Sequence, residues 1–295
     1  CRSDWFEKQP QLHGIPTVTA YDLALRQVRV FLTSLFSAQR AARILDEYPG
    51  KYLQPVLCNP RFLNVLANIN QHTPLENVGA ALRRLVETLI QRELQQGGES
   101  AVSSSDLEYA LARLAVEDKA TVPYEHALRL LGGEAALTTG VRAGLLFING
   151  TGVRFTYQLF RSYFAAVWMN QAAVTWQSMQ SRNDFYLIFL CLAGISSTPD
   201  DLVISIYHEY PELAINCLVT DVSVLTVKRV LSYWLRIGQS LDLPMLTHVN
   251  RLPEALVSMM REETWSIRQT AHGILQMLPV DYLSLIHISE PTRPY

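Results

Sequence analysis

The sequence predicts a mostly α-helical chain with one short β-hairpin near its middle. Apolar residues recur at helical spacing through most of the chain, including every segment after residue 176. Two short apolar runs, 145–148 and 153–155, instead flank the sequence Asn-Gly-Thr-Gly. Because Asn and Gly tolerate the positive φ angles of a tight turn, we expect these runs to pair as a hairpin.

The hairpin leads directly into a helix with one broad apolar face. Its apolar residues fall at positions i, i+3, i+4, i+7 and i+8, namely Phe160, Tyr163, Phe164, Val167 and Trp168. We expect the first three of these rings to lie in the core rather than around a cofactor. A hairpin that runs into such a helix is typical of the end of a winged-helix unit, with another α+β arrangement as the alternative.

The composition favours a folded protein and disfavours several functions. Apolar residues make up 49% of the chain and charged residues 18%. The formal net charge of −2 and the pI near 6.4 give no broad basic field for nucleic acid or anionic lipid. The longest apolar run, residues 185–195, is about half of the roughly 20 residues that a transmembrane helix needs. We expect a buried helix there and no membrane association.

The cysteines and histidines indicate neither a disulfide framework nor a metal site. Cys1, Cys58, Cys191 and Cys217 form no Cys-x-x-Cys pair, which favours reduced thiols in a cytoplasmic protein. The seven histidines show no His-Glu-x-x-His or comparable ligand spacing. No Gly-x-Ser-x-Gly occurs, and nothing else in the sequence indicates a nucleophile.

The first third of the chain has several helix starts. Residues 21–36 and 38–47 have the spacing of two helices. Asn59 can cap a helix whose first position is Pro60, because proline lacks the N–H that this position leaves unpaired. Residues 73–76, Thr-Pro-Leu-Glu, form a capping box. The helix beyond it is expected to bury six apolar residues: Val78, Leu82, Leu85, Val86, Leu89 and Ile90.

The middle third has the helix order of a winged-helix domain, which we place at residues 98–176. A second capping box, Ser105 with Glu108, is expected to open a helix there. The apolar residues that this helix turns inward are Leu107, Leu111, Leu114 and Ala115. Two short helices at 123–131 and 134–143 precede the hairpin.

Residues 177–283 contain short helices in succession, which predicts a stacked α-solenoid. Near its end, Ala271 is small enough for two helices to approach closely. Residues 284–295 break the helical pattern and resemble a translated sequencing adaptor, so we expect a non-native tail, with a genuine polar tail as the alternative. Since the chain begins without Met, we expect it to be a fragment of a longer protein.

Several motifs, in a consistent order, resemble those of the NACHT-type STAND NTPases, the NLR-like signalling ATPases. Residues 155–166, FTYQLFRSYFAA, resemble the phrase F-x-H-x-x-F-x-E-Y-F-A-A that closes the winged helix of that family. Residues 57–63, LCNPRFL, resemble the N-P-x-x-L of its first helical domain, and residues 73–93 match the segment after it. Residues 1–3, Cys-Arg-Ser, resemble the end of its sensor strand, and residues 265–278 resemble a HEAT repeat.

The resemblance implies a division into parts. Residues 1–97 would hold the end of the NTPase core and the first helical domain, followed by the winged helix, and 177–283 would be HEAT-like repeats. The parent protein would bind ATP or ADP with Mg²⁺ through a P-loop and an acidic strand. No G-x-x-x-x-G-K-[ST] occurs in this chain, so the chain alone is not expected to hydrolyse ATP or to hold a nucleotide tightly.

The resemblance also implies three nucleotide-binding residues. Pro60 would pack against adenine, and Arg2 would offset charge on the γ-phosphate. The histidine that touches the ADP phosphate in the family is replaced here by Tyr157, whose hydroxyl can donate a hydrogen bond but cannot carry imidazolium charge. The acidic residue of the same phrase is replaced by Ser162.

The function that the resemblance implies is the regulatory part of an ATP/ADP-dependent switch in defence or signalling. The winged helix would pack over ADP and hold the molecule closed. An unidentified trigger ligand, a protein or another molecule, would bind the repeats and favour the open form, and exchange for ATP would permit self-association.

Two alternatives stay open. A non-enzymatic helical-repeat scaffold for protein–protein interaction predicts a monomer that is indifferent to ATP. DNA binding by the winged helix is disfavoured, because Arg142 and Arg154 are too sparse for a phosphate track.

Overall fold

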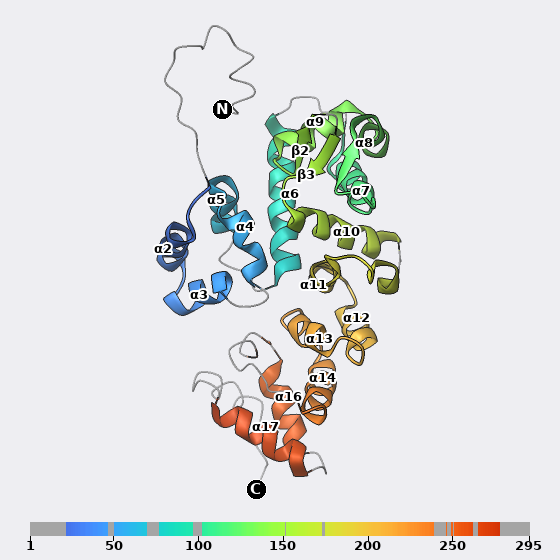
Figure 1. Ribbon diagram of the computed structural model, residues 1–295. Coiled ribbons are helices and arrows are strands. Elements are labelled where there is room, and N and C mark those ends of the chain that lie inside the picture. Colours follow the sequence, from blue (N-terminus) through green and yellow to red (C-terminus); the bar gives the residue numbers. More distant parts are fainter. Residues whose placement is uncertain are drawn as a thin grey trace.

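The computed structural model describes residues 22–46, 50–69, 77–96, 102–150, 152–172, 175–238, 246, 249, 251–261 and 265–277. Helices dominate these ranges and one small antiparallel sheet accompanies them, as the sequence predicts (Figure 1). Arg2, the capping box at 73–76 and the expected tail at 284–295 lie outside the described residues.

The N-terminal helices pack in sequence order beside one long helix, α6 (Val78–Gln96). The helices and the 3₁₀ turn before it are α2 (Leu25–Leu35), α3 (Ala38–Asp46), η2 (Gly50–Leu53), α4 (Gln54–Leu57) and α5 (Pro60–Ile69). The six apolar residues predicted for the inner face of α6 are all buried. At the start of α5 the Asn59 Oδ1 accepts the Arg61 N–H at 3.0 Å, which confirms the predicted cap.

The middle of the chain builds the sheet and the helices around it. These elements are α7 (Ser104–Ala115), β1 (Thr121–Pro123), α8 (Tyr124–Leu131), α9 (Glu134–Arg142), β2 (Leu146–Asn149) and β3 (Gly152–Phe155). The β2–β3 hairpin is confirmed, and Gly150 in its turn has φ +56°. The strand β1 is not predicted by the sequence; it pairs antiparallel with β3, so the order is β1–β3–β2.

The predicted cap of α7 is wrong by two residues. Ser103, not Ser105, accepts the Asp106 N–H, at 3.1 Å. Glu108 turns inward instead of reaching back to the helix start, and its carboxylate accepts the Tyr163 hydroxyl at 3.4 Å. The helix therefore begins two residues earlier than predicted, and the four residues expected to point inward are buried as predicted.

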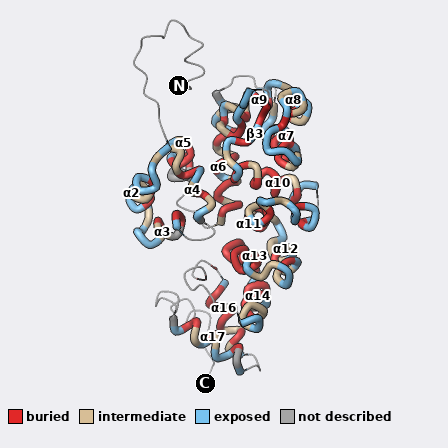
Figure 2. Tube along the Cα trace, viewed as in Figure 1, coloured by how far each residue is buried: buried red, intermediate tan, exposed pale blue. Residues whose placement is uncertain are grey.

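Two helices, α10 (Gln158–Ala172) and α11 (Phe185–Ile195), form the centre of the molecule (Figure 2). Phe160, Tyr163 and Phe164 are fully buried, which confirms their place in the core. Burial extends around most of α10 rather than over one face, because α6, α7, α11 and β3 all pack against it. The predicted buried helix at 185–195 matches α11. Among the described helices, none has both the length and the hydropathy to cross a membrane.

The remaining helices follow one another away from α11, each packed on its neighbour (Figure 1). They are α12 (Pro199–Ile206), α13 (Pro211–Cys217), α14 (Val224–Arg236), α16 (Leu252–Met260) and α17 (Trp265–Met277). The short 3₁₀ turn η3 (Trp176–Met179) lies between α10 and α11 in the chain. Ala271 is fully buried on α17, which packs on α16. One cluster of buried apolar residues runs from Val28 on α2 to Leu275 on α17, so the three expected parts share a continuous core and their boundaries stay a prediction.

Candidate functional site

The start of α5 and the residues just before α10 meet in one joint, although they are far apart in the sequence. Pro60 occupies the first position of α5 and is exposed. Tyr157 directly precedes α10 and is half-buried. The structure therefore brings the segments of two of the three predicted nucleotide-binding residues together, while Arg2 lies outside the described residues.

Aromatic rings form the apolar part of this joint. The Phe62 ring on α5 lies edge-on to Tyr157 and to Phe160, with ring centroids 5.9 Å and 5.4 Å apart. Tyr157 and Phe160 also contact each other edge-on, at 5.8 Å. Edge-to-face pairs of this kind contribute about 0.5–1.5 kcal/mol beyond the area that they bury.

Arg61 and Asn59 form the polar part of the joint. The Arg61 guanidinium donates to the Arg142 carbonyl at the end of α9, at 2.8 Å, and forms an ion pair with Glu93 on α6, also at 2.8 Å. The Asn59 amide donates to the Tyr157 hydroxyl over a long distance of 3.5 Å. One end of α5 is thus fixed to α6, to α9 and to the segment that enters α10.

The surroundings of Tyr157 keep its hydroxyl protonated. Burial raises its pKa, as do the nearby Asp22 carboxylate and the Cys58 thiol, while the hydrogen bond from Asn59 acts in the opposite direction. Among the described residues this hydroxyl accepts from Asn59 and donates to none. It can therefore donate a hydrogen bond to an oxygen of a ligand, such as a phosphate oxygen.

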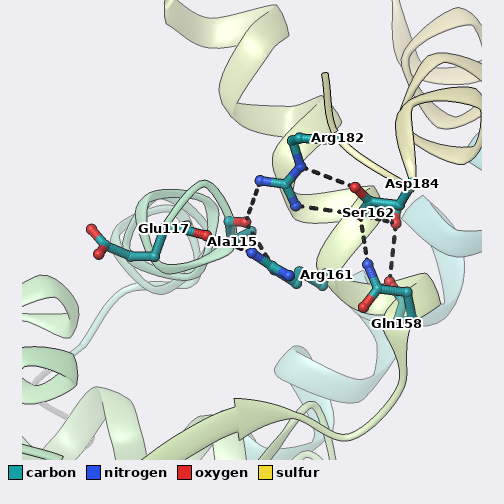
Figure 3. Close-up of polar contacts among 7 residues, drawn as sticks. All are labelled: Ala115, Glu117, Gln158, Arg161, Ser162, Arg182 and Asp184. Atoms are coloured by element: carbon teal, nitrogen blue, oxygen red, sulfur yellow. Dashed lines mark hydrogen bonds and ion pairs between the residues drawn. The ribbon is translucent and has the colours of Figure 1, made fainter. Parts of the chain in front are cut away.

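A second polar cluster joins the start of α10 to the end of α7 and to the segment before α11, and it was not predicted from the sequence (Figure 3). Arg161 on α10 and Arg182 before α11 both donate to the carbonyl oxygen of Ala115, each at 3.3 Å. Arg161 also donates to the carbonyl of Glu117. Ala115 is the last residue of α7, so two guanidinium groups satisfy the carbonyl end of that helix, where the helix dipole is negative.

Asp184 organises the rest of this cluster. Its carboxylate accepts from Arg182 at 3.0 Å and 3.3 Å, from the buried Ser162 hydroxyl at 2.8 Å and from the Gln158 amide at 2.6 Å. Burial alone would raise the pKa of Asp184, but the hydrogen bonds and charge of Arg182, the Ser162 hydroxyl and the charge of Arg161 outweigh it, so this pKa lies below its ordinary value. Asp184 is therefore ionised at neutral pH.

A cavity of about 650 Å³ adjoins the cluster. Three segments line it: residues 116–118 after α7, the first turn of α10 around Arg161, and residues 178–184 before α11. The sequence carries one signal for this site: Ser162 stands where the phrase that it resembles has an acidic residue. The acceptors Ala115 and Glu117 act through backbone carbonyls, which carry no sequence signature.

Comparisons of the chain with protein-family models, with curated proteins and with solved structures gave no match. Within the described ranges, no group of three or more His, Cys, Asp or Glu side chains gathers where a metal ion could bind.

Proposed function

We propose that this chain is the regulatory part of a nucleotide-dependent switch of the STAND class, in which the joint between α5 and Tyr157 responds to ADP or ATP bound by the parent protein. The observation that carries the proposal is the contact of Asn59 and Phe62 with Tyr157. Two motifs that resemble separate segments of the family were identified independently in the sequence. Their meeting at one joint is what a shared nucleotide site requires.

The topology around the sheet supports a winged-helix unit within residues 98–176. The chain order is helix, short strand, two helices, hairpin and helix, with β3 in the middle of the sheet. This is the order of a winged helix, and Tyr157 follows its last strand directly. The consecutive packing of α12 to α17 supports, in the same way, a solenoid that follows the winged helix.

In the proposed switch, Tyr157 acts as a latch. Its protonated hydroxyl donates to a phosphate oxygen of ADP, and the exposed ring of Pro60 offers an apolar surface to the base. ADP thereby holds the start of α5 and the winged helix in one arrangement. A trigger ligand on the C-terminal helices favours a second arrangement, in which ADP is released, ATP binds and the protein self-associates in a defence or signalling response.

The test uses the full-length parent protein with Tyr157→Phe, which removes the hydroxyl and keeps the ring contacts with Phe62 and Phe160. Loss of a hydrogen bond to a charged phosphate corresponds to about 10–100-fold faster ADP release, with easier self-association. Tyr109→Phe is the matched control, because Tyr109 is an exposed tyrosine of α7 that lies outside the joint. If ADP release and oligomeric state are the same in the Tyr157 variant, the control and the wild type, the latch is wrong.

A non-enzymatic scaffold is the second candidate, and one observation favours it. Trp265 on α17 has 65% of its surface exposed, and exposed tryptophans are enriched as anchors of protein–protein interfaces. This function predicts a full-length protein whose oligomeric state does not respond to ATP or ADP and whose partner binding is lost in Trp265→Ala. Size-exclusion chromatography of the parent protein with each nucleotide separates the two candidates.

A further inference from the structure

We propose that the cavity beside α10 binds a small molecule with an oxyanion group, a carboxylate or a phosphate, through the Arg161 guanidinium. This site is distinct from the Tyr157 joint, and the proposal does not depend on nucleotide binding there. It follows from three features of the cluster: crowded positive charge, free hydrogen-bond donors and the size of the cavity.

Positive charge is crowded at this point. The guanidinium groups of Arg161 and Arg182 converge on the same Ala115 carbonyl. Arg182 has its counter-charge in Asp184, which it contacts with two nitrogens. Within the described part of the chain, Arg161 forms no ion pair of its own. Burial lowers the pKa of Arg161 and so does the charge of Arg182, with Asp184 and Asp118 opposing them. An anion beside Arg161 would relieve this repulsion.

Donors remain available towards the cavity. Arg161 uses its Nε and Nη2 on backbone carbonyls, and its Nη1 donates to no group among the described residues. Ser181 and Asn183 also line the cavity, and a serine hydroxyl and an asparagine amide can add donors to a bound oxyanion. A guanidinium is suited to this task, because its planar fork matches carboxylate and phosphate oxygens.

The dimensions fit a small ligand. A volume of about 650 Å³ falls within the range of roughly 300–1,000 Å³ that is typical of small-molecule sites. The lining comes from the residues after α7, from the first turn of α10 and from the segment before α11. A bound molecule would therefore bridge all three. Binding would therefore stabilise the packing of α11 on α10.

Asp118 gives the proposal a second, opposite test. It lies in the lining as an exposed carboxylate and attracts the Arg161 charge without a direct ion pair. A bound anion must compete with this carboxylate. Asp118→Asn is therefore expected to tighten anion binding about threefold, whereas Arg161→Gln should weaken it about tenfold or more.

The experiment measures thermal unfolding of the chain in increasing sodium phosphate, sodium acetate or sodium chloride at constant ionic strength. Binding to the folded state raises the melting temperature with anion concentration. Phosphate also stabilises proteins without binding to them, so the comparison between variants is what decides. Arg113→Gln is the matched control, because Arg113 is an exposed arginine of α7 outside the cavity.

The expected result is a saturable oxyanion effect that is lost in Arg161→Gln, enhanced in Asp118→Asn and unchanged in Arg113→Gln. An effect of phosphate alone identifies a phosphate ligand, and an effect of acetate as well identifies a carboxylate-compatible site. Equal responses of all four proteins would overturn the proposal, as would the absence of any oxyanion effect beyond chloride. If Arg161→Gln does not fold, an unchanged response in Asp118→Asn is by itself sufficient to overturn it.

Discussion

Gly79 on α6 and Gly194 on α11 bring the backbones of their two helices into direct contact. A Cβ atom placed on Gly79 would lie 2.9 Å from the Gly194 Cα and 2.3 Å from the Cys191 carbonyl oxygen. A Cβ on Gly194 would lie 2.8 Å from the Gly79 Cα. Both sets of distances are too short for a side chain, so the crossing of α6 and α11 depends on glycine at both positions.

Gly194→Ala is therefore expected to destabilise the protein, because the helices must separate where the core is continuous. Overpacking of this kind costs about 1–3 kcal/mol of unfolding free energy, and backbone contacts place this site at the upper end. Urea unfolding followed by circular dichroism measures the change.

Gly273→Ala is the matched control on α17. Apart from the two chain neighbours and the backbone of its own helix, no atom lies within 4 Å of a Cβ placed there, and a helical Gly→Ala change then stabilises by about 0.5–1 kcal/mol. The two substitutions should shift the urea midpoint in opposite directions. A Gly194 variant as stable as the wild type would contradict the close crossing.

Asp184 should make stability depend on pH in acid. Its pKa in the folded protein lies below the unfolded value, so the ionised form is favoured by folding. This contribution is fully present above the unfolded pKa of about 4 and is lost as the pH falls through the folded pKa. At neutral pH, Asp184→Asn is expected to cost about 1–3 kcal/mol, because Arg182 loses its counter-charge.

The difference between the wild type and Asp184→Asn should shrink as the pH falls below about 4. Asp46→Asn is the control: Asp46 pairs with Arg29 at 2.7 Å but both side chains are almost half exposed. Surface pairs of that kind contribute about 0–1 kcal/mol, so Asp46→Asn should hardly change the free energy of unfolding. A constant difference between the wild type and Asp184→Asn across the acid range would show that the carboxylate charge contributes nothing.

The sequence predicts those parts of the fold whose information is local. The hairpin, α11 and the inner face of α6 each follow from spacing within one segment, and the structure confirms them. The strand β1 was missed because it has only three residues, Thr121 to Pro123, and exists through its pairing with the distant β3. The cap of α7 was misplaced because three consecutive serines, 103–105, could each serve as the cap. Glu108, the predicted partner of Ser105 in the capping box, instead accepts a hydrogen bond from Tyr163.

The candidate sites divide in the same way. Tyr157 and Pro60 could be predicted from their motifs, with Asn59 predicted only as a helix cap. The Arg61 link between α5, α6 and α9 could not be predicted, because one of its acceptors is a backbone carbonyl. The cluster of Arg161, Arg182 and Asp184 joins residues of different elements. Their spacing in the sequence matches no known motif, so the cluster becomes recognisable only in the folded chain.

If the proposed STAND resemblance holds, Ser162 and Asp184 together are expected to supply the carboxylate that an acidic residue would supply at the position of Ser162. The Ser162 hydroxyl donates to the Asp184 carboxylate at 2.8 Å, so a carboxylate lies beside position 162 although the residue there is neutral. Ser162→Glu alone adds a second negative charge in a buried position and should destabilise. Asp184→Ser alone leaves Arg182 unpaired and should also destabilise.

The double variant with both substitutions should recover part of the loss, because the new glutamate then supplies the charge for Arg182. Neighbouring residues in one network couple by about 0.5–3 kcal/mol, and we expect a favourable coupling in this range from a double-mutant cycle of unfolding free energies. Losses that simply add would show that the two carboxylates do not occupy equivalent places.

Arg61 should control how firmly the start of α5 is held at the Tyr157 joint. Its partner Glu93 has only 12% of its side chain exposed, so Arg61→Ala leaves a largely buried carboxylate unpaired and is expected to cost about 2–4 kcal/mol. Adding Glu93→Gln removes that charge, and the double variant should therefore be less destabilised than the two single losses together.

Because Arg61 also holds the Arg142 carbonyl, amide hydrogen exchange in Arg61→Ala should increase near the end of α9 and stay unchanged in α14, which lies away from the joint. Equal increases in both helices would mean that Arg61 stabilises the whole protein and has no special role at the joint.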